Sequence, residues 1–488
     1  METNDQIKRH SLKSVKWVAF GFILPRLITP IITVLLAKIL VPSDFGIISI
    51  CSVFIGVINL IQGLGFSDFI IKEKEIDQTY LSTAFWSNMV LSIFVLGLMW
   101  IVAPIVASIY HEPLIGKVLP VLGLAVVFNG AGTIQWALLQ KEMKFKRLFK
   151  IRILPLFVSL CITLPLAYLG YGVWSLVVGE VSKSLFVNIA YWMVGKWIPR
   201  FVFSIEAMKQ MLKFGKWIIT EKVQEYLYSN LDSIFLGYFG NLSVLGIYTI
   251  GRQIIFVLYN TINGPIGGIV FPMLSKMQAE IEKVRNGFFE VSKRVMLVNI
   301  PVTIAVAVLS FDAVPLLFSN KWQGLPLVLS IGVIGEGVAR LIWAQRDMFK
   351  ILNRPDVYPK AVMINLLFAA VCYPFGAING LIAFCLVRAF NDWLYAGIQL
   401  VLTSKMFAFK KMEYIKLLLP SLYSSVSMAA ATLLILALFK FAGFTITILP
   451  FLIITVLAVI LFIVFFKTFA RNDFGKMWNE MKVIVGLS

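Results

Sequence analysis

The stretch Leu40-Val-Pro-Ser-Asp-Phe-Gly46-Ile-Ile-Ser follows the first long apolar segment of the chain, and Gly240-Asn-Leu-Ser-Val-Leu-Gly246-Ile-Tyr-Thr follows the seventh. The glycines at 46 and 246 match at an offset of 200 residues. Similar loops after the first and the seventh segment indicate that a unit of six segments is duplicated.

Two further pairs of apolar segments repeat their polar positions. The fourth and tenth segments match at an offset of 207 residues, and the sixth and twelfth match at an offset of 208. The first pair aligns Asn129, Thr133, Trp136 and Gln140 with Glu336, Arg340, Trp343 and Asp347, and the second aligns Gly172, Glu180, Lys183 and Ser184 with Gly380, Arg388, Asn391 and Asp392. Chance similarity between apolar segments is the alternative, but it does not predict matched polar positions. The sequence therefore favours a repeat.

The composition identifies the solvent around these segments. Of the 488 residues, 59% are hydrophobic and 14% are charged, whereas soluble proteins are about 45–50% apolar. A helix needs about 20 apolar residues to span a bilayer. The sequence predicts an all-α polytopic membrane protein with about fourteen such spans, at residues 15–39, 46–70, 80–109, 115–140, 149–169, 173–195, 213–239, 246–272, 295–318, 324–349, 359–375, 379–402, 416–439 and 447–466.

Basic residues alternate between the loops and so predict the orientation. With a cytoplasmic N-terminus, 33 of the 44 Lys and Arg residues lie in cytoplasmic segments and 3 lie outside, namely Lys117, Lys321 and Lys440. This asymmetry is the positive-inside pattern, with both termini cytoplasmic, and it accounts for the net charge of +19 without nucleic acid.

An even number of spans gives both copies of the repeat the same orientation, related by an axis along the membrane normal. We predict an N-terminal six-helix lobe over residues 1–200, a second six-helix lobe over 201–410, and two additional helices with a cytoplasmic tail over 411–488. In the cytoplasmic segment 274–294, charges interleave with apolar residues at helical spacing. This spacing predicts an amphipathic helix at the membrane surface, with a solvated linker helix as the alternative.

Chemistry on the substrate is not indicated. The four cysteines lie apart within apolar segments, and the two histidines lie in a tail and a loop, so we expect no metal site and no cofactor. A membrane-embedded polymerase or ligase would need a sizeable outer loop, but the predicted outer loops are about eight residues or shorter. We expect no catalytic residue and no enzyme.

Charged residues inside the spans indicate a polar cavity, because each costs about 2.5–3.5 kcal/mol at mid-bilayer unless it faces a partner or water. The cations, which suit phosphate oxygens, are Arg26, Lys183, Arg252, Arg340 and Arg388. The acids, which we assign to charge compensation or to proton or ion coupling, are Glu180, Glu221, Glu225, Asp232, Glu336 and Asp392. Alternatively, these charges pair with one another to hold helices together.

Four stretches carry a resemblance to a known family. They are the loop at 40–47, Gly-Leu-Gly-Phe-Ser-Asp-Phe-Ile-Ile at 63–71, Gly-Tyr-Gly-Val-Trp-Ser-Leu-Val-Val-Gly at 170–179, and Leu-Gly-Ile-Tyr at 245–248. The chain resembles the polysaccharide repeat-unit flippases of the Wzx type, near the teichuronic and colanic acid exporters, in the multidrug/oligosaccharidyl-lipid/polysaccharide exporter superfamily. These motifs consist of turn and packing residues, so they indicate the family better than the cargo.

The resemblance implies two six-helix lobes around a cavity that opens alternately to either side of a bacterial plasma (inner) membrane. It implies an undecaprenyl-pyrophosphate-linked oligosaccharide as the cargo, whose anionic head the cations would contact. Membrane lipids are further partners, and the polysaccharide polymerase and glycosyltransferases of the same pathway are candidates. A cation-coupled multidrug antiporter and a lipid II flippase of the same superfamily remain alternatives.

Overall fold

The computed structural model describes residues 24, 28–62, 66–73, 75–278, 280–342, 345–352, 354, 356–471 and 475. Regular structure in these residues is helical. The chain packs as two compact units, Met1–Ile250 and Gly251–Ser488. The first unit contains a short helix, Ile28–Ile39, and then α2 (Pro42–Gln62), α3 (Phe66–Lys72), α4 (Gln78–Ile109), α5 (Pro113–Lys141), α6 (Phe145–Tyr168), α7 (Val173–Val194) and α8 (Ile205–Phe239).

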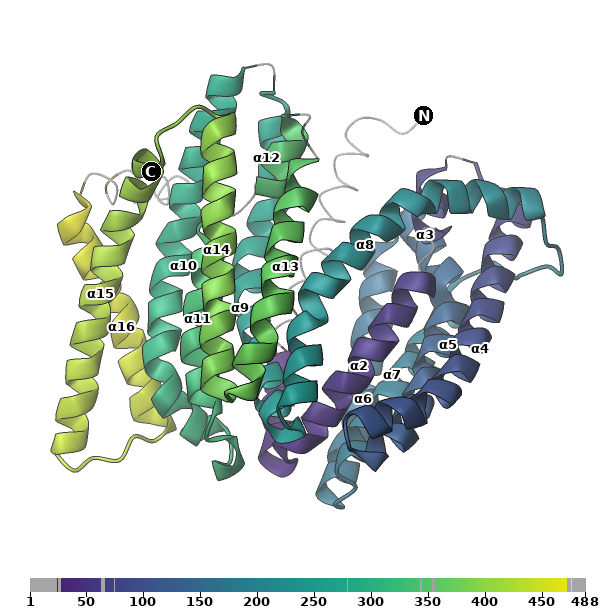
Figure 1. The fold of residues 1–488 in the computed structure, drawn as a ribbon, viewed down its shortest axis with the longest axis horizontal. Coiled ribbons are helices and arrows are strands. Elements are labelled where there is room, and N and C mark those ends of the chain that lie inside the picture. Colours follow the sequence, from purple (N-terminus) through teal and green to yellow (C-terminus); the bar gives the residue numbers. More distant parts are fainter. Residues whose placement is uncertain are drawn as a thin grey trace. The chain divides into compact units, whose positions relative to one another are not determined.

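The second unit contains most of α9 and all later helices (Figure 1). Their bounds are α9 (Leu242–Ser275), α10 (Ile281–Leu317), η1 (Asn320–Trp322), α11 (Leu325–Arg340), α12 (Gln345–Ile351), α13 (Val357–Ile378), α14 (Leu381–Met406), α15 (Lys411–Phe441) and α16 (Ile448–Phe469). The C-terminal hairpin of α15 and α16 packs on α10.

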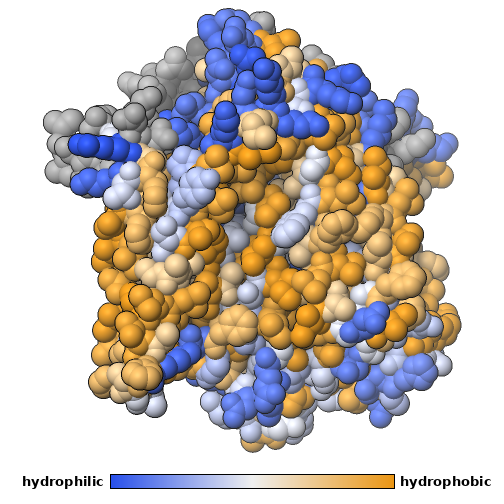
Figure 2. Space-filling view, turned by 60° about the vertical axis from the view of Figure 1, so that its left-hand side comes forward, coloured by the Kyte–Doolittle hydropathy of each residue, from blue (hydrophilic) through white to orange (hydrophobic). Residues whose placement is uncertain are grey.

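Ten of the described helices are long and apolar enough to cross a membrane, and two shorter helices are also apolar. Figure 2 shows one face of the molecule on which hydrophobic residues form a broad band between two hydrophilic ends. Such a band matches the hydrocarbon layer of a bilayer. The predicted all-helical, multi-pass membrane protein is therefore confirmed.

One predicted span is divided in the structure. The span predicted over 324–349 consists of α11 and α12, with Leu341 and Ile342 in a turn after α11. The span predicted over 46–70 contains α2 and α3, and residues 63–65 of it lie outside the described residues. Hydropathy records only how apolar a stretch is, so it does not reveal where the backbone leaves the helical path.

The segment 274–294 does not form a separate surface helix, contrary to our expectation. Residues from Ile281 onward are the first turns of α10, which has 37 residues and a length of about 55 Å. Val284 and Phe288 on its apolar face are 0% and 1% exposed, because other parts of the second unit cover them. The amphipathic pattern was correct, but protein covers Val284 and Phe288 on the apolar face, whereas Ile281 at its start is 56% exposed.

Helix packing follows the same order in both units. In the first, α5 packs on α4 and α7, and α7 packs on α6. In the second, α11 packs on α10 and α14, and α14 packs on α13. Gly172 and Gly380, which precede α7 and α14, both have positive φ, of 52° and 91°. A left-handed backbone favours glycine, and this explains a glycine at both positions.

The two loops at 40–49 and 240–249 lie against each other. A methyl group at Gly46 would collide with the carbonyl oxygen of Leu242, and one at Gly246 would collide with the carbonyl oxygen of Pro42. The hydroxyl groups of Ser49 and Thr249 are 3.0 Å apart and hydrogen-bonded. Each loop therefore makes the same kind of contact with the other, at positions 200 residues apart. Such reciprocal contacts are typical of an interface with two-fold symmetry.

The helix α8 packs on α2, α3 and α4 within the first unit. In Figure 1 its first turns run across the bundle near α3, and its later turns descend beside α2. The predicted second lobe begins at residue 201 and would include α8, whereas packing assigns α8 to the unit Met1–Ile250. The division into repeat-based lobes at 200 and 410 stays a prediction.

Candidate functional site

Two glycines bring α11 close to its neighbours on either side of Glu336. A methyl group at Gly335 would lie 2.8 Å from the Cα atom of Ala389 in α14. A methyl group at Gly337 would lie 2.6 Å from the Thr303 hydroxyl in α10. Because the flanking positions lack side chains, the charged side chain between them lies at a junction of helices.

Glu336 pairs with Arg340 one turn later in α11. The Nε and Nη2 atoms of Arg340 donate to Oε1 of Glu336 at 2.8 and 2.5 Å. The two side chains are 23% and 25% exposed, so this pair is neither sealed nor fully solvated. The i, i+4 spacing places both residues on one face of the helix and allows this pair.

Arg388 of α14 makes a second, more deeply buried pair. Its Nη2 atom lies 3.4 Å from Oδ1 of Asp392, and the two side chains are 13% and 4% exposed. Its Nη1 atom donates to the Tyr373 hydroxyl of α13 at 3.0 Å. Asn391 donates to the same hydroxyl at 2.9 Å. Tyr373 therefore holds one terminal nitrogen of the guanidinium, and Asp392 lies near the other.

These pairs form one charged cluster in the second unit. Glu336 interacts electrostatically with Arg340, Arg388 and Arg252. We define the arginine cluster as Arg252, Glu336, Arg340, Arg388 and Asp392. It combines three guanidinium groups with two carboxylates, so it has a net positive charge, and Arg340 is partly exposed. The guanidinium groups of such a cluster can donate charge-assisted hydrogen bonds to the oxygens of an anionic group.

The first unit has a pocket of about 150 Å³, with both polar and apolar lining residues, between the helix Ile28–Ile39, α6 and α7. Lys183 and Glu180 line it and form an ion pair of 2.5 Å. Its hydroxyl groups belong to Thr29, Thr33, Ser159 and Thr163. Three of them donate to helix carbonyl groups, as Ser159 does to Gly179 at 2.7 Å, so their lone pairs remain as acceptors.

The remaining predicted site residues fall into three situations. Arg26 and the side chain of Glu221 lie outside the described residues. Glu225 is exposed on α8, whereas Asp232, two turns later, is 0% exposed. The Tyr248 hydroxyl donates to Oδ2 of Asp232 at 2.6 Å, and the backbone N–H of Ser233 donates to Oδ1 at 2.7 Å. Glu225 and Asp232 therefore do not share one environment.

Sequence reasoning missed the uncharged groups that position the charges. Tyr373 lies in an apolar helix with no signal that it receives two hydrogen bonds. Tyr248 belongs to the Leu-Gly-Ile-Tyr stretch, which suggested only a family resemblance. The glycines at 335 and 337 flank a charged residue, and this pattern in a span could have indicated close helix packing.

Comparison with known proteins agrees with this fold. The profile of a family described as "Polysaccharide biosynthesis protein" matches residues 35–326. The chain is 25% identical to the lipopolysaccharide biosynthesis protein WzxC of Escherichia coli (strain K12), over 80% of each chain. It is also 25% identical to the teichuronic acid biosynthesis protein TuaB of Bacillus subtilis (strain 168), over 57% of this chain and 58% of that protein. These matches confirm the resemblance inferred from the motifs.

Two solved structures are similar in fold. The lipid II flippase MurJ in an inward closed conformation superposes with a TM-score of 0.76 at 16% identity, over 94% of this chain and 99% of that one. An inward-facing multidrug resistance transporter of the MATE family and the MOP superfamily gives a TM-score of 0.61 at 14% identity, over 81% and 98%. At these identities the likeness establishes a shared fold.

Proposed function

Because the chain belongs to the family of polysaccharide biosynthesis proteins, we propose that it is a flippase that moves a lipid-linked oligosaccharide across the plasma membrane. The proposed cargo is an undecaprenyl-pyrophosphate-linked repeat unit of a polysaccharide. Its sugar-pyrophosphate head cannot cross about 30 Å of hydrocarbon unaided. The protein would shield the head while the polyprenyl tail remains in lipid.

The observation that carries this proposal is the arginine cluster. An excess of guanidinium groups in an otherwise apolar helical unit suits a phosphate-bearing head, because guanidinium can bind phosphate in a bidentate manner. In the proposed role Arg340 and Arg388 contact the pyrophosphate, and Glu336 and Asp392 balance their charge when the cargo is absent. Arg252 and Arg26 are proposed to contribute to the same function.

The topology we propose has fourteen spans with both termini in the cytoplasm. The distribution of basic residues supports the orientation, and the order of helix packing supports two related six-helix lobes. The reciprocal contacts at an offset of 200 residues support a two-fold relation between the repeats. Rocking of the lobes would open the cavity to one side of the membrane at a time.

Coupling to a gradient is proposed for the remaining charged residues. Glu180 lines a pocket with Thr and Ser hydroxyl groups, where its carboxylate suits a proton or another small cation. Asp232, Glu221 and Glu225 on α8 are assigned to the same purpose. Lys183, the partner of Glu180, is proposed, like the arginines, to contact the anionic head. The polysaccharide polymerase and the glycosyltransferases of the pathway are proposed as partners of the full system.

The test is to delete the gene and to measure which lipid-linked oligosaccharide accumulates on the cytoplasmic leaflet. The proposal predicts such an accumulation, and it predicts that the gene carrying Arg340→Gln will relieve it less than the wild-type gene does. Dye efflux measured in the same cells should not change. If efflux falls and no oligosaccharide accumulates, the protein is a multidrug antiporter and the proposal is wrong.

A further inference from the structure

The helix that carries Glu336 and Arg340 ends at Arg340 itself. The next residues, Leu341 and Ile342, form a turn, and a new helix, α12, begins at Gln345. The Leu341 N–H donates to the carbonyl of Val338 at 3.1 Å, three residues back, so the last turn is tighter than an α-helical turn. Interrupting a helix frees backbone groups, which need new partners within a membrane protein.

A tyrosine from the C-terminal hairpin supplies such a partner. The Tyr414 hydroxyl of α15 donates to the carbonyl oxygen of Leu341 at 2.7 Å. Tyr414 is 1% exposed, so water does not compete for this hydrogen bond.

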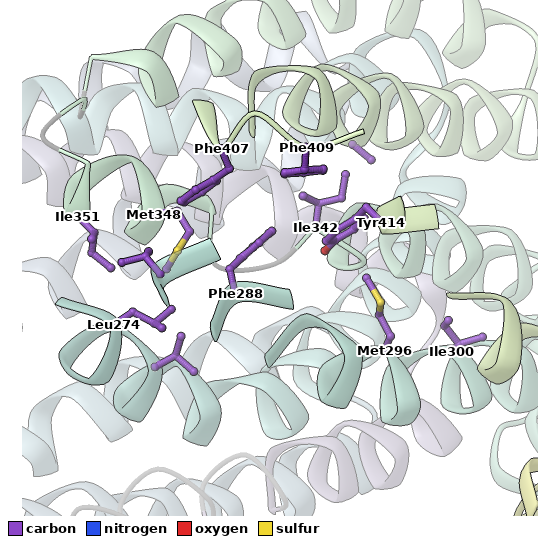
Figure 3. Packing of buried hydrophobic residues seen from close by; sticks show 13 residues of the cluster. Leu274, Phe288, Met296, Ile300, Ile342, Met348, Ile351, Phe407, Phe409 and Tyr414 are labelled. Carbon is purple, nitrogen blue, oxygen red and sulfur yellow. The ribbon is translucent and has the colours of Figure 1, made fainter. Parts of the chain in front are cut away.

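An aromatic cluster holds Tyr414 in place. Its ring stacks on Phe288 with centroids 5.7 Å apart and on Phe409 with centroids 6.0 Å apart. Figure 3 shows Tyr414 beside Ile342, and the same cluster contains Met348 of α12. Residues on both sides of the interruption therefore pack against the group that holds the tyrosine.

We propose that Tyr414 is a positioning residue for the arginine cluster, acting through the Leu341 carbonyl to hold the last turn of α11. That turn carries Glu336 and Arg340, and its end is fixed by a hydrogen bond from a helix outside both predicted six-helix lobes. This inference rests on the proposed function, since it gives the C-terminal hairpin a role in binding the anionic head.

The expected effect follows from the strength of one hydrogen bond. A net contribution of about 1 kcal/mol, with a spread of about half that value, corresponds to roughly a two- to tenfold change in an equilibrium constant. Without the hydroxyl, the last turn of α11 would fray, and Arg340 would occupy its binding position for a smaller fraction of the time. Affinity for a pyrophosphate head should fall by that factor, and affinity for an uncharged polyprenol should not.

The test uses the full-length protein in phosphatidylcholine nanodiscs, with farnesyl pyrophosphate as the probe and farnesol as its uncharged counterpart, titrated by calorimetry. Tyr414→Phe deletes the hydroxyl and keeps the ring. Tyr423→Phe is the matched control, because Tyr423 lies on the same helix and is 55% exposed. We expect Tyr414→Phe to weaken farnesyl pyrophosphate binding by roughly two- to tenfold, and Tyr423→Phe to bind as the wild type does.

A double-mutant cycle with Arg340→Gln separates positioning from general stability. If Tyr414 acts through Arg340, the tyrosine substitution should have little further effect once the arginine is absent. An equal loss in both backgrounds, an equal loss for farnesol, or no loss at all would overturn the inference. If Arg340→Gln alone leaves affinity unchanged, the proposed function fails at this site, and the inference fails with it.

Hydrogen–deuterium exchange gives a second measurement that needs no ligand. The amides from Glu336 to Ile351 should exchange faster in Tyr414→Phe than in Tyr423→Phe, because the turn opens more often. Equal exchange rates in the two variants would also overturn the inference.

Discussion

Substitution of Arg388 by glutamine tests whether the arginine cluster binds an anion or only holds helices together. Both readings predict that Arg388→Gln lowers the free energy of unfolding, because the guanidinium pairs with Asp392, whose side chain is 4% exposed. Breaking a buried ion pair from one side costs about 3–5 kcal/mol. The arginine is 13% exposed and lies 3.4 Å from the carboxylate, so we expect a loss near the lower limit, about 3 kcal/mol.

The double variant Arg388→Gln with Asp392→Asn separates the two readings. Removing both charges leaves two neutral amides and no uncompensated buried charge, and that charge is the main cost of breaking the pair from one side. We expect the double variant to recover most of the lost stability. Anion binding should not recover, because charge-assisted hydrogen bonds of about 1.5–3 kcal/mol are gone, which is roughly a ten- to hundredfold loss of affinity.

The assays are chemical unfolding of the purified full-length protein and titration with farnesyl pyrophosphate. Lys283→Gln provides the control, since Lys283 pairs with Glu280 at 2.7 Å but the two side chains are 62% and 60% exposed and lie outside the cluster. This variant should lose at most about 1 kcal/mol and should keep its affinity. If the double variant binds farnesyl pyrophosphate as tightly as the wild type, Arg388 is a structural partner and the reasoning is refuted.

Three further outcomes follow from the structure. Gly246→Val should destabilise the protein by about 1–3 kcal/mol, because the valine side chain would collide with the Pro42 carbonyl. Gly397→Ala should not destabilise it, because the space around Gly397 is open. The unfolding midpoints of both variants check this. Tyr248→Phe removes a hydroxyl that donates to the buried Asp232 and should cost about 1–3 kcal/mol in the same assay, with exposed Tyr423→Phe as the neutral comparison. Hydrogen bonds from Arg354 and Lys360 lower the pKa of Asp356 from 3.8 to about 2. The stability that the ionised Asp356 adds is therefore present above pH 4 and disappears as the pH falls toward 2. The difference in unfolding free energy between the wild type and Asp356→Asn should vanish over that range, and a constant difference would contradict this prediction.

Hydropathy and charge located most helices because bilayer thickness and topology selection act directly on composition. The predicted spans 173–195 and 447–466 correspond to α7 (Val173–Val194) and α16 (Ile448–Phe469). The interruption after Arg340 was not predictable, because the hydroxyl that satisfies the Leu341 carbonyl lies 73 residues later in the chain. Nor could periodicity decide whether protein or lipid covers the apolar face at the start of α10.

The candidate site was predictable to the extent that it depends on spacing within one helix. Glu336 and Arg340 are four residues apart, and the structure pairs them. Arg388 and Asp392 have the same spacing and also pair. Contacts between helices were not predictable, since Tyr373 approaches Arg388 from another helix through a hydroxyl that no charge pattern marks.

The internal pairing of the arginines suits a flippase better than unpaired arginines would. A bare buried guanidinium would bind phosphate tightly, but a carrier has to release its cargo on the far side of the membrane. In the proposed role, an incoming anion would exchange one partner for another and would gain only the difference, since Glu336 and Asp392 already pair with Arg340 and Arg388. With this exchange, no uncompensated charge remains in the site before or after transport. An uncompensated charge inside the membrane would be costly. Binding and release then differ by a modest free energy, which a change in exposure of the cluster could reverse.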